Sequence, residues 1–335
     1  MKFKKDYSIA MSNASENAKN TAIFCPQVSV IIPIYNGADD LPDLIKWLRC
    51  QTYPRDHIEY LLINNNSSDR TLEIINEAAT TASNEGLKLF SLTENTIQSS
   101  YAARNLGIRT STGDILAFTD ADCRPSPDWV EKIIQPFADP EIAIVVGELM
   151  ALPGNSLLEK YAERYGVMSQ KFLLEHPFCP YGQTANLAIR KEILQKVGLF
   201  RPYLTTGGDA DICWRIQREG QGKLAFAVEA IVLHRHRANL RELRSQWRRY
   251  GQSNTYLHEL YGVDLMREFT LQEAVYRLSR WLFKEIPRNV FNLIRQQVHP
   301  LDLIRMPIDV LSFQARSAGQ KAAKLPEKAR EIEWL

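Results

Sequence analysis

The sequence predicts an α/β fold, with a doubly wound, mostly parallel sheet and helices on both faces. Runs rich in β-branched residues at 28–33, 58–63 and 115–118 are typical of strands buried on both sides. Turn-forming residues follow each of these runs. Segments with helical spacing of apolar residues, such as 41–48, lie between them. Strands that alternate with helices in this way give parallel sheets with right-handed crossovers.

The remaining elements follow the same logic along the chain. A polar loop at 64–69 caps the next helix, Ser126 and Pro127 start another, and Gly220 ends a third. The expected strands are 28–33, 58–63, 87–92, 115–118, 142–146, 185–189 and 223–228, with 230–233 leading into His234. The expected helices are 39–48, 71–82, 99–110, one from Ser126, 157–174, 191–197 and 207–218.

The pattern changes beyond residue 239. A strongly basic helix occupies 239–250, and beyond Phe269 apolar stripes interleave with Arg and Lys. We therefore expect a disordered leader at 1–26, an α/β domain at 27–260, a C-terminal helical extension at 261–316, and a loose polar tail at 317–335.

Composition excludes several classes of protein. The chain has 335 residues, is 45% hydrophobic and 24% charged, and carries a formal net charge of +2, which does not suggest a nucleic-acid partner. Its five cysteines are scattered, which argues against a disulfide framework or a zinc site. No apolar stretch approaches the ~18 residues of a membrane span, and no signal peptide is evident. A cytoplasmic protein is expected, with the inner face of the membrane as an alternative.

Asp120 and Asp122 directly follow the apolar run 115–118. Open α/β sheets bind ligands at the carboxyl ends of their strands. Two carboxylates there would suit a hard divalent cation, Mg²⁺ or Mn²⁺, that shares its coordination with phosphate oxygens. A simple strand-to-loop turn is the alternative, because Asp favours turns.

Several motifs occur in the order of one known family. They are Val28–Asn36, the 64–69 loop, Ala103-Arg104-Asn105-Leu106-Gly107, Thr119-Asp120-Ala121-Asp122, and Gly207-Gly208-Asp209-Ala210-Asp211-Ile212-Cys213-Trp214-Arg215. Over roughly residues 26–255 the sequence resembles the family 2 glycosyltransferases, which are inverting, nucleotide-sugar-dependent enzymes of the GT-A fold. Five motifs in family order are more specific than any one of them.

The resemblance implies roles for the acidic residues. A metal at Asp122, with Asp120 on the ribose or the metal and His234 as a further ligand, would neutralise the leaving diphosphate. Asp209 would be the general base, at the start of a helix and with an ordinary pKa of about 3.9. The alternatives are a surface role for His234 and helix capping for Asp209. Asp211 would be structural or would orient the acceptor.

The resemblance also assigns a nucleotide-binding half and shows departures from the family. Its residues would be Pro33, Tyr35, Asn36, Asn64 and Arg104, with Arg104 near the diphosphate or the base. The family usually has Asp at position 64 and Glu at position 208, so donor-base selectivity and acceptor contacts differ here. Ser99 also replaces a common Gly. None of these changes removes a predicted metal ligand or the base.

The expected reaction is transfer from a nucleotide-diphosphate sugar, a UDP-sugar first, to a glycan or lipid-linked acceptor in surface polysaccharide or glycolipid synthesis. Trp247 would stack on a sugar of the acceptor or pack its helix. Residues 270–316 would contact a membrane, pack on the domain or form a dimer. An inactive sugar-binding scaffold and a nucleotidyltransferase are the competing functions. The latter lacks a basic phosphate loop after the first strand.

Overall fold

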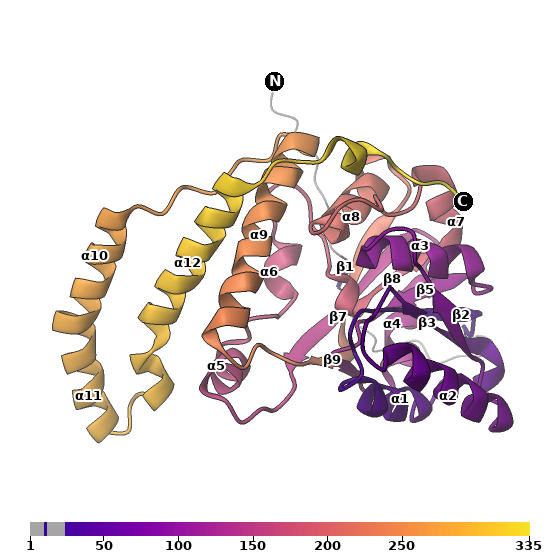
Figure 1. Ribbon diagram of the computed structural model, residues 1–335, viewed down its shortest axis with the longest axis horizontal. Coiled ribbons are helices and arrows are strands. Elements are labelled where there is room, and N and C mark those ends of the chain that lie inside the picture. Colours follow the sequence, from indigo (N-terminus) through magenta and orange to yellow (C-terminus); the bar gives the residue numbers. More distant parts are fainter. Residues whose placement is uncertain (1–9, 12–23) are drawn as a thin grey trace. The chain divides into compact units, whose positions relative to one another are not determined.

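Residue contacts divide the chain into two units, and the computed structural model describes residues 10–11 and 24–335 (Figure 1). The first unit comprises the described residues up to Leu152 together with Gly166–Arg235 and Pro326–Leu335. The second unit comprises Pro153–Tyr165 and His236–Leu325. The α/β unit therefore ends at Arg235, earlier than the predicted boundary at residue 260, and the chain returns to it at Pro326.

The strands described in the first unit form one nine-stranded sheet. They are β1 (Ala10–Met11), β2 (Val28–Ile34), β3 (Ile58–Asn64), β4 (Leu89–Thr93), β5 (Ile115–Phe118), β6 (Cys123–Pro125), β7 (Ile142–Ala151), β8 (Leu187–Arg190) and β9 (Lys223–His234). Their order is β1-β9-β7-β8-β5-β2-β3-β4, with β6 paired to β9 beside this path. Neighbours are parallel except that β8 is antiparallel to β5 and β7, and β6 is antiparallel to β9. The mixed, mostly parallel α/β sheet confirms the predicted fold class.

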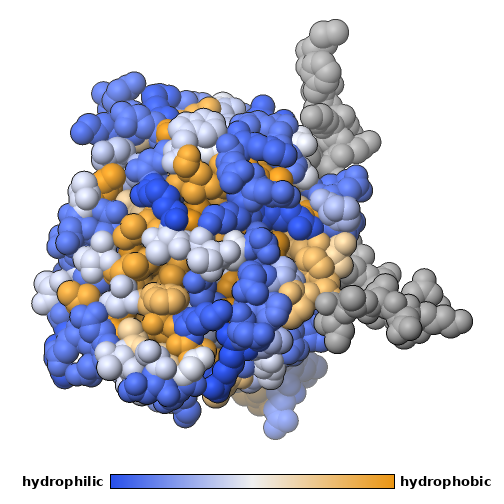
Figure 2. Space-filling view, turned by 90° about the vertical axis from the view of Figure 1, so that its right-hand side faces the viewer, coloured by the Kyte–Doolittle hydropathy of each residue, from blue (hydrophilic) through white to orange (hydrophobic). Residues whose placement is uncertain are grey.

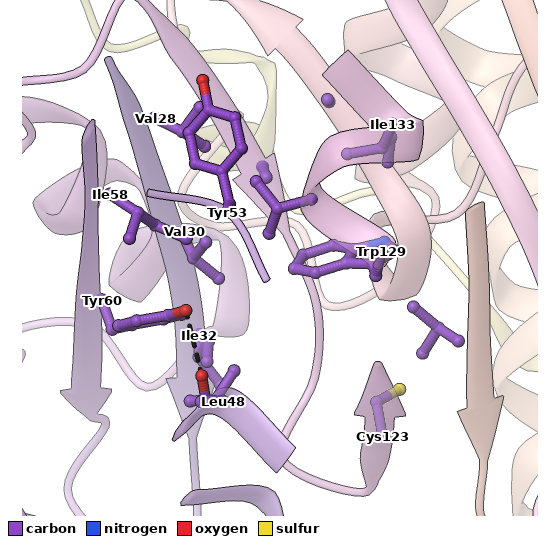
Figure 3. Packing of buried hydrophobic residues seen from close by; sticks show 14 of the residues in the cluster. Val28, Val30, Ile32, Leu48, Tyr53, Ile58, Tyr60, Cys123, Trp129 and Ile133 are labelled. Atoms are coloured by element: carbon purple, nitrogen blue, oxygen red, sulfur yellow. Dashed lines mark hydrogen bonds between the residues drawn. The ribbon is translucent and has the colours of Figure 1, made fainter. Parts of the chain in front are cut away.

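Helices cover both faces of this sheet. Those of the first unit are α1 (Leu41–Arg49), α2 (Thr71–Asn84), α3 (Ser100–Thr110), α4 (Trp129–Ile134), α6 (Lys171–Leu174), α7 (Lys191–Val197) and α8 (Gly208–Arg218), with 3-10 turns η1 (Arg55–His57), η2 (Gln135–Ala138), η3 (Thr184–Asn186) and η6 (Glu327–Arg330). Val30 and Ile32 of β2 pack in a core cluster with residues of α1, α2 and α4, Trp129 among them (Figure 3). Ile31, between them, faces the opposite way, and a Cβ on Gly107 of α3 would meet its side chain at 2.6 Å.

Three segments differ from the predicted elements. The expected helix at 157–174 is interrupted, because Gly166 has a φ of +56° and follows the end of α5 (Leu157–Tyr165). β9 is one strand through residue 234, with an irregular pairing to β7 between Gly147 and Glu148. β6 was not predicted, because three residues carry no readable period.

The second unit is helical. Its elements after α5 are α9 (Leu240–Tyr261), α10 (Leu271–Arg280), the π-helical turn η4 (Trp281–Glu285), α11 (Ile286–Ile294), η5 (Pro300–Leu303) and α12 (Arg305–Ala322). α9 and α12 lie side by side (Figure 1), and their backbones approach closely at Gly251 and Gly319, where an added Cβ would overlap the carbonyl oxygens of Arg316 and Arg248. Among the described residues, no helix is both long enough and apolar enough to cross a bilayer.

Two predictions concern the ends of the chain. The disordered leader at 1–26 falls largely outside the described residues, and Ala10–Met11 pairs with β9. The expectation of a loose tail at 317–335 is wrong. Residues 317–322 complete α12, and Ala329, further along, is fully buried in the first unit.

On the face shown in Figure 2, hydrophobic residues lie in patches among hydrophilic ones, as on most folded proteins.

Candidate active site

Asp122 and His234 lie together beyond the carboxyl end of β5. The antiparallel pairing of β6 with β9 sets Cys123 opposite His234, which brings the preceding residue, Asp122, beside the imidazole. An Asp122 carboxylate oxygen lies 3.6 Å from His234 Nε2. His234 is buried, whereas Asp122 is partly exposed. An oxygen and a nitrogen at this separation fit shared coordination of one divalent cation such as Mn²⁺.

Two neighbouring residues fit the metal role less well. The Cys123 thiol lies within 4.8 Å of the ligand atoms of Asp122 and His234, but its side chain is fully buried in the core (Figure 3). Burial raises the pKa of this thiol well above its usual range, which makes it a less favourable ligand than the other two. Asp120, predicted as a possible second ligand, does not belong to this group among the described residues. Its carboxylate pairs with Arg104 instead.

Asp40 holds the loop that carries Asp122, and sequence reasoning missed it. Its two carboxylate oxygens bind Arg124 at 3.2 Å and Arg235 at 2.5 Å. Arg124 also donates hydrogen bonds to the carbonyl oxygens of Ala121 and Cys123. Burial raises the pKa of Asp40, while the two guanidinium groups act in the opposite direction. Asp40 and Arg124 thus fix the backbone on both sides of Asp122, and Arg235 takes part in that pairing.

Arg104 projects from α3 toward the Asp120 carboxylate. One guanidinium nitrogen lies 2.5 Å from Asp120 Oδ1, and the same group lies over the ring of Tyr101 at 5.6 Å. Arg104 is buried, while the Asp120 side chain is about one-third exposed. The pair holds the Arg104 guanidinium in place at the carboxyl edge of the sheet, where its planar donors could bind an anionic ligand.

Asp209 lies in the first turn of α8 and is held by Thr184. The Thr184 hydroxyl donates a hydrogen bond of 2.8 Å to Asp209 Oδ1. Thr184 reaches this place because Thr119 Oγ1 bonds the carbonyl of Ala185 and β5 pairs with β8. Burial raises the pKa of Asp209, and Arg104 and the Thr184 hydrogen bonds counteract that rise. The expectation of an ordinary pKa for Asp209 is therefore wrong, because its pKa is raised.

Tyr101 supports the start of α8. Its hydroxyl accepts a hydrogen bond of 2.9 Å from the backbone N–H of Gly208, and its ring stacks on Phe200. A Cβ on Gly208 would meet the Tyr101 ring at 2.6 Å. The ring therefore fills the space that a Glu at position 208, the usual family residue, would need. Ser99 caps α3 by accepting a hydrogen bond from the Tyr101 N–H.

The predicted nucleotide-binding residues meet where β2 and β3 end. The register pairs Ile34 with Asn64, and Pro33 is buried beneath the exposed Tyr35 and Asn36. The loop after Asn64 is held by side-chain amides. Asn36 Oδ1 accepts from the N–H of Ser68 at 2.8 Å, and Asn64 Oδ1 accepts from that of Ser67 at 3.2 Å.

Two residues predicted on the acceptor side have other partners. Asp211 is fully buried, and its carboxylate oxygens bind Arg201 at 2.9 Å and Arg215 at 3.0 Å. Of its two predicted roles, these contacts favour the structural one. Trp247 belongs to the second unit, where its ring contacts Tyr250 edge-on and Arg316 lies over it.

Sequence comparisons identify the family of the chain. Residues 29–198 match the model described as Glycosyl transferase family 2, and residues 115–307 match Glycosyl transferase family group 2. Glycosyltransferase AglE of Haloferax volcanii is 33% identical over 248 residues, which are 73% of this chain and 79% of AglE. The chain belongs to glycosyl transferase family 2. This glycosyltransferase is also 32% identical to the undecaprenyl-phosphate 4-deoxy-4-formamido-L-arabinose transferase of Klebsiella pneumoniae strain 342, over 41% of each chain.

A solved structure of another protein has the same fold as this family 2 glycosyltransferase. The chain resembles the mannosyltransferase PcManGT from Pyrobaculum calidifontis, solved with GDP-Man and Mn²⁺, with a TM-score of 0.63 and 17% identity. The match covers 95% of this chain and 91% of the other. The enzyme therefore has the GT-A fold, with its candidate site at the sheet edge where β2, β3 and β5 end.

Proposed function

We propose that this glycosyltransferase inverts the anomeric centre while moving a sugar from a nucleotide-diphosphate sugar to a hydroxyl of a glycan or lipid-linked acceptor. One observation supports this most directly: Arg104 pairs with Asp120 and also acts electrostatically on Asp209, close to the Asp122–His234 pair. The proposed diphosphate site and the proposed carboxylate base would thus occupy neighbouring positions. Surface polysaccharide or glycolipid synthesis is the proposed setting, supported by the Klebsiella relative's lipid-linked acceptor.

The donor's nucleoside would lie against the loops after β2 and β3, with Tyr35, Asn36 and Asn64 around it. Arg104 and Asp120 would hold the ribose and diphosphate. Asp122 and His234 would bind a divalent cation, Mn²⁺ or Mg²⁺, whose charge would neutralise the departing diphosphate. Asp40 and Arg124 keep the Asp122 backbone in place for that role.

Asp209 would take the proton of the acceptor hydroxyl. The acceptor oxygen attacks the anomeric carbon as the bond to the diphosphate oxygen breaks, so the electron pair leaves with the nucleoside diphosphate. A single displacement of this kind inverts the anomeric configuration. A placed carboxylate base contributes about 10²–10⁴-fold to the rate. The Thr184 hydrogen bond would orient this carboxylate and lowers its pKa against the rise caused by burial.

Turnover of nucleotide sugars by the full-length protein tests this function. UDP-sugars form the first group, and GDP-mannose is added because PcManGT was solved with GDP-Man. With Mn²⁺ present, we expect release of the nucleoside diphosphate from one donor. Asp122→Asn and Asp209→Asn should each reduce this about 10²-fold or more. Asp114→Asn, at an exposed position just before β5, is the matched control and should retain activity.

Product stereochemistry and binding separate the alternatives. A product whose anomeric configuration matches the donor would contradict inversion. Binding of a nucleotide sugar without turnover would support the inactive scaffold. Transfer of a nucleotidyl group would support the nucleotidyltransferase. Chelation of divalent cations should abolish turnover, and addition of Mn²⁺ should restore it. Full activity in the presence of the chelator would contradict the metal role.

A further inference from the structure

The segment 326–335, which we call the strap, makes its contacts beside α3, α7 and α8. The chain reaches the strap only after the whole second unit, and Figure 1 shows its end next to α7. We propose that the strap is part of the catalytic apparatus and that Glu333 is a positioning residue for Arg104 and Asp209. This inference rests on the proposed function.

Glu333 binds two residues of α3. Its carboxylate oxygen Oε2 accepts hydrogen bonds from Asn105 Nδ2 at 2.8 Å and from Arg109 at 2.7 Å. Asn105 is fully buried and directly follows Arg104, the partner of Asp120. A charge-assisted bond to a buried amide is among the stronger hydrogen bonds in proteins. Glu333 therefore fixes the turn of α3 that carries the Arg104 guanidinium.

The strap backbone binds the segment after α7. Leu199 N–H donates to the carbonyl of Glu333 at 2.7 Å, and Arg201 donates to the carbonyl of Arg330. Gly198 has a φ of +79°, and a Cβ there would overlap the side chain of Ile332. Both the left-handed backbone and the close approach favour glycine at this position. The packing between this segment and the strap is therefore specific.

The segment after α7 in turn supports the base. Phe200 exchanges two hydrogen bonds with the Asn105 side chain, of 2.8 and 3.1 Å, and its ring stacks on Tyr101. The Tyr101 hydroxyl accepts a hydrogen bond from the backbone N–H of Gly208, the residue before Asp209. Arg201, bound to the strap, also holds Asp211 in the same turn of α8.

These contacts connect both halves of the site. Through Asn105 the strap fixes the helix of Arg104, and through residues 199–201 it fixes the first turn of α8. A small misplacement of reacting groups is enough to slow an enzymatic reaction strongly. Removal of the strap contacts is therefore expected to slow the chemical step, while the loops after β2 and β3, to which no contact of the strap leads among the described residues, keep their affinity for the nucleoside.

The test compares Glu333→Ala with Glu331→Ala in the full-length protein. Glu331 lies two residues earlier in the strap and is exposed, so it is a control of equal charge change. For Glu333→Ala we expect kcat to fall about three- to tenfold, with the affinity for the free nucleoside, which the loops after β2 and β3 would hold, within about twofold of wild type. The assays are run at a temperature well below the unfolding midpoint of each variant, so that a loss of stability does not change the amount of folded enzyme.

Amide hydrogen exchange gives a readout that does not need turnover. Glu333→Ala should speed exchange in α3 and the first turn of α8, while Glu331→Ala should not. Unchanged exchange in Glu333→Ala, faster exchange without a loss of kcat, or an equal loss in Glu331→Ala would overturn the proposal. Absence of turnover in the wild type would instead contradict the proposed function, and exchange would still report on the strap.

Discussion

At the residue scale, the proposed base is held between opposing influences on its ionisation. Burial raises the pKa of Asp209, and Arg104 and Thr184 act to lower it. A raised pKa strengthens a carboxylate as a proton acceptor, provided that it remains ionised at the working pH. Thr184 favours the ionised form because its hydroxyl donates to the carboxylate. If Asp209 is the base, as we propose, Thr184 would therefore help to set the lower pH limit of activity.

We expect Thr184→Val to shift the acid limb of kcat/KM toward higher pH. The substitution removes the donor to Asp209, so the carboxyl protonates more readily and the base is lost earlier as the pH falls. The pH profile of kcat/KM measures this, because it reports the free enzyme's ionisations. Thr80→Val is the control, since the Thr80 hydroxyl bonds only the carbonyl of Asn76 in its own helix. An acid limb at the wild-type position would show that Thr184 does not influence the base.

Sequence patterns indicated the acidic residues of the site but not the residues that hold them. Asp120, Asp122 and Asp209 stand in motifs with local spacing, so they were readable without a structure. Thr184 and Asp40 belong to no such motif. They reach the site through strand register and long-range ion pairs, and the sequence shows neither directly.

At the element scale, the short strand β6 has more influence on the site than its length suggests. Its pairing with β9 brings Asp122 to His234, and Arg124 within it binds Asp40 and two carbonyl oxygens of the adjoining loop. Groups that orient metal ligands typically change metal affinity about 10- to 100-fold when they are removed. Arg124 is therefore expected to influence metal binding although it is not a ligand.

Arg124→Lys should raise the Mn²⁺ concentration needed for half-maximal activity about tenfold. Lysine keeps the charge, but it cannot span Asp40 and both carbonyl oxygens as the planar guanidinium does. Titration of turnover against Mn²⁺ measures the shift. Arg55→Lys is the control, because Arg55 is exposed in a 3-10 turn and its guanidinium bonds the carbonyl of Glu85. An unchanged Mn²⁺ dependence in Arg124→Lys would remove Arg124 from metal positioning.

Elements with a long, regular period were predictable, and those fixed by tertiary contacts were not. β2, β3 and β5 and the helices between them follow from apolar runs and helical spacing. The break after α5 depends on one glycine with positive φ, and the antiparallel direction of β8 depends on pairing with distant strands. A strand run in a sequence carries no direction, so the reversal of β8 could not be inferred.

At the scale of the whole molecule, the strap shows why the tail could not be read from composition. Its polar residues are typical of a loose end, yet Glu333 and Arg330 use polar groups to bind other residues of the first unit.

In the second unit, by contrast, apolar residues that would be expected to pack in a core lie at the surface. The surface formed by α10, η4 and α11 carries large apolar side chains that stay exposed, including Phe283 at 77% and Ile294 at 78%. Basic residues accompany them at positions 277, 280, 284, 288 and 295.

This surface has the composition of helices that lie on an anionic membrane. Its two acidic residues, Glu273 and Glu285, form ion pairs with Arg277 and Arg280, and further basic residues stand at positions 284, 288 and 295. Apolar side chains beside basic ones favour shallow insertion among lipid headgroups. Each basic residue near an anionic surface adds about 1 kcal/mol. We therefore propose peripheral contact with the membrane through residues 270–316.

The double variant Phe283→Ser, Ile294→Ser should bind anionic vesicles about tenfold more weakly than the wild type. Both side chains are exposed, so the substitutions remove insertion energy without opening the core. Flotation with phosphatidylglycerol-containing vesicles and with neutral vesicles measures binding, and the wild type should prefer the anionic ones. Phe172→Ser, at a 69% exposed position in the first unit, is the matched control and should bind as the wild type does. If the double variant floats as well as the wild type, or the wild type does not float, this surface has another partner, and measurement of the oligomeric state would then decide whether that partner is a second copy of the chain.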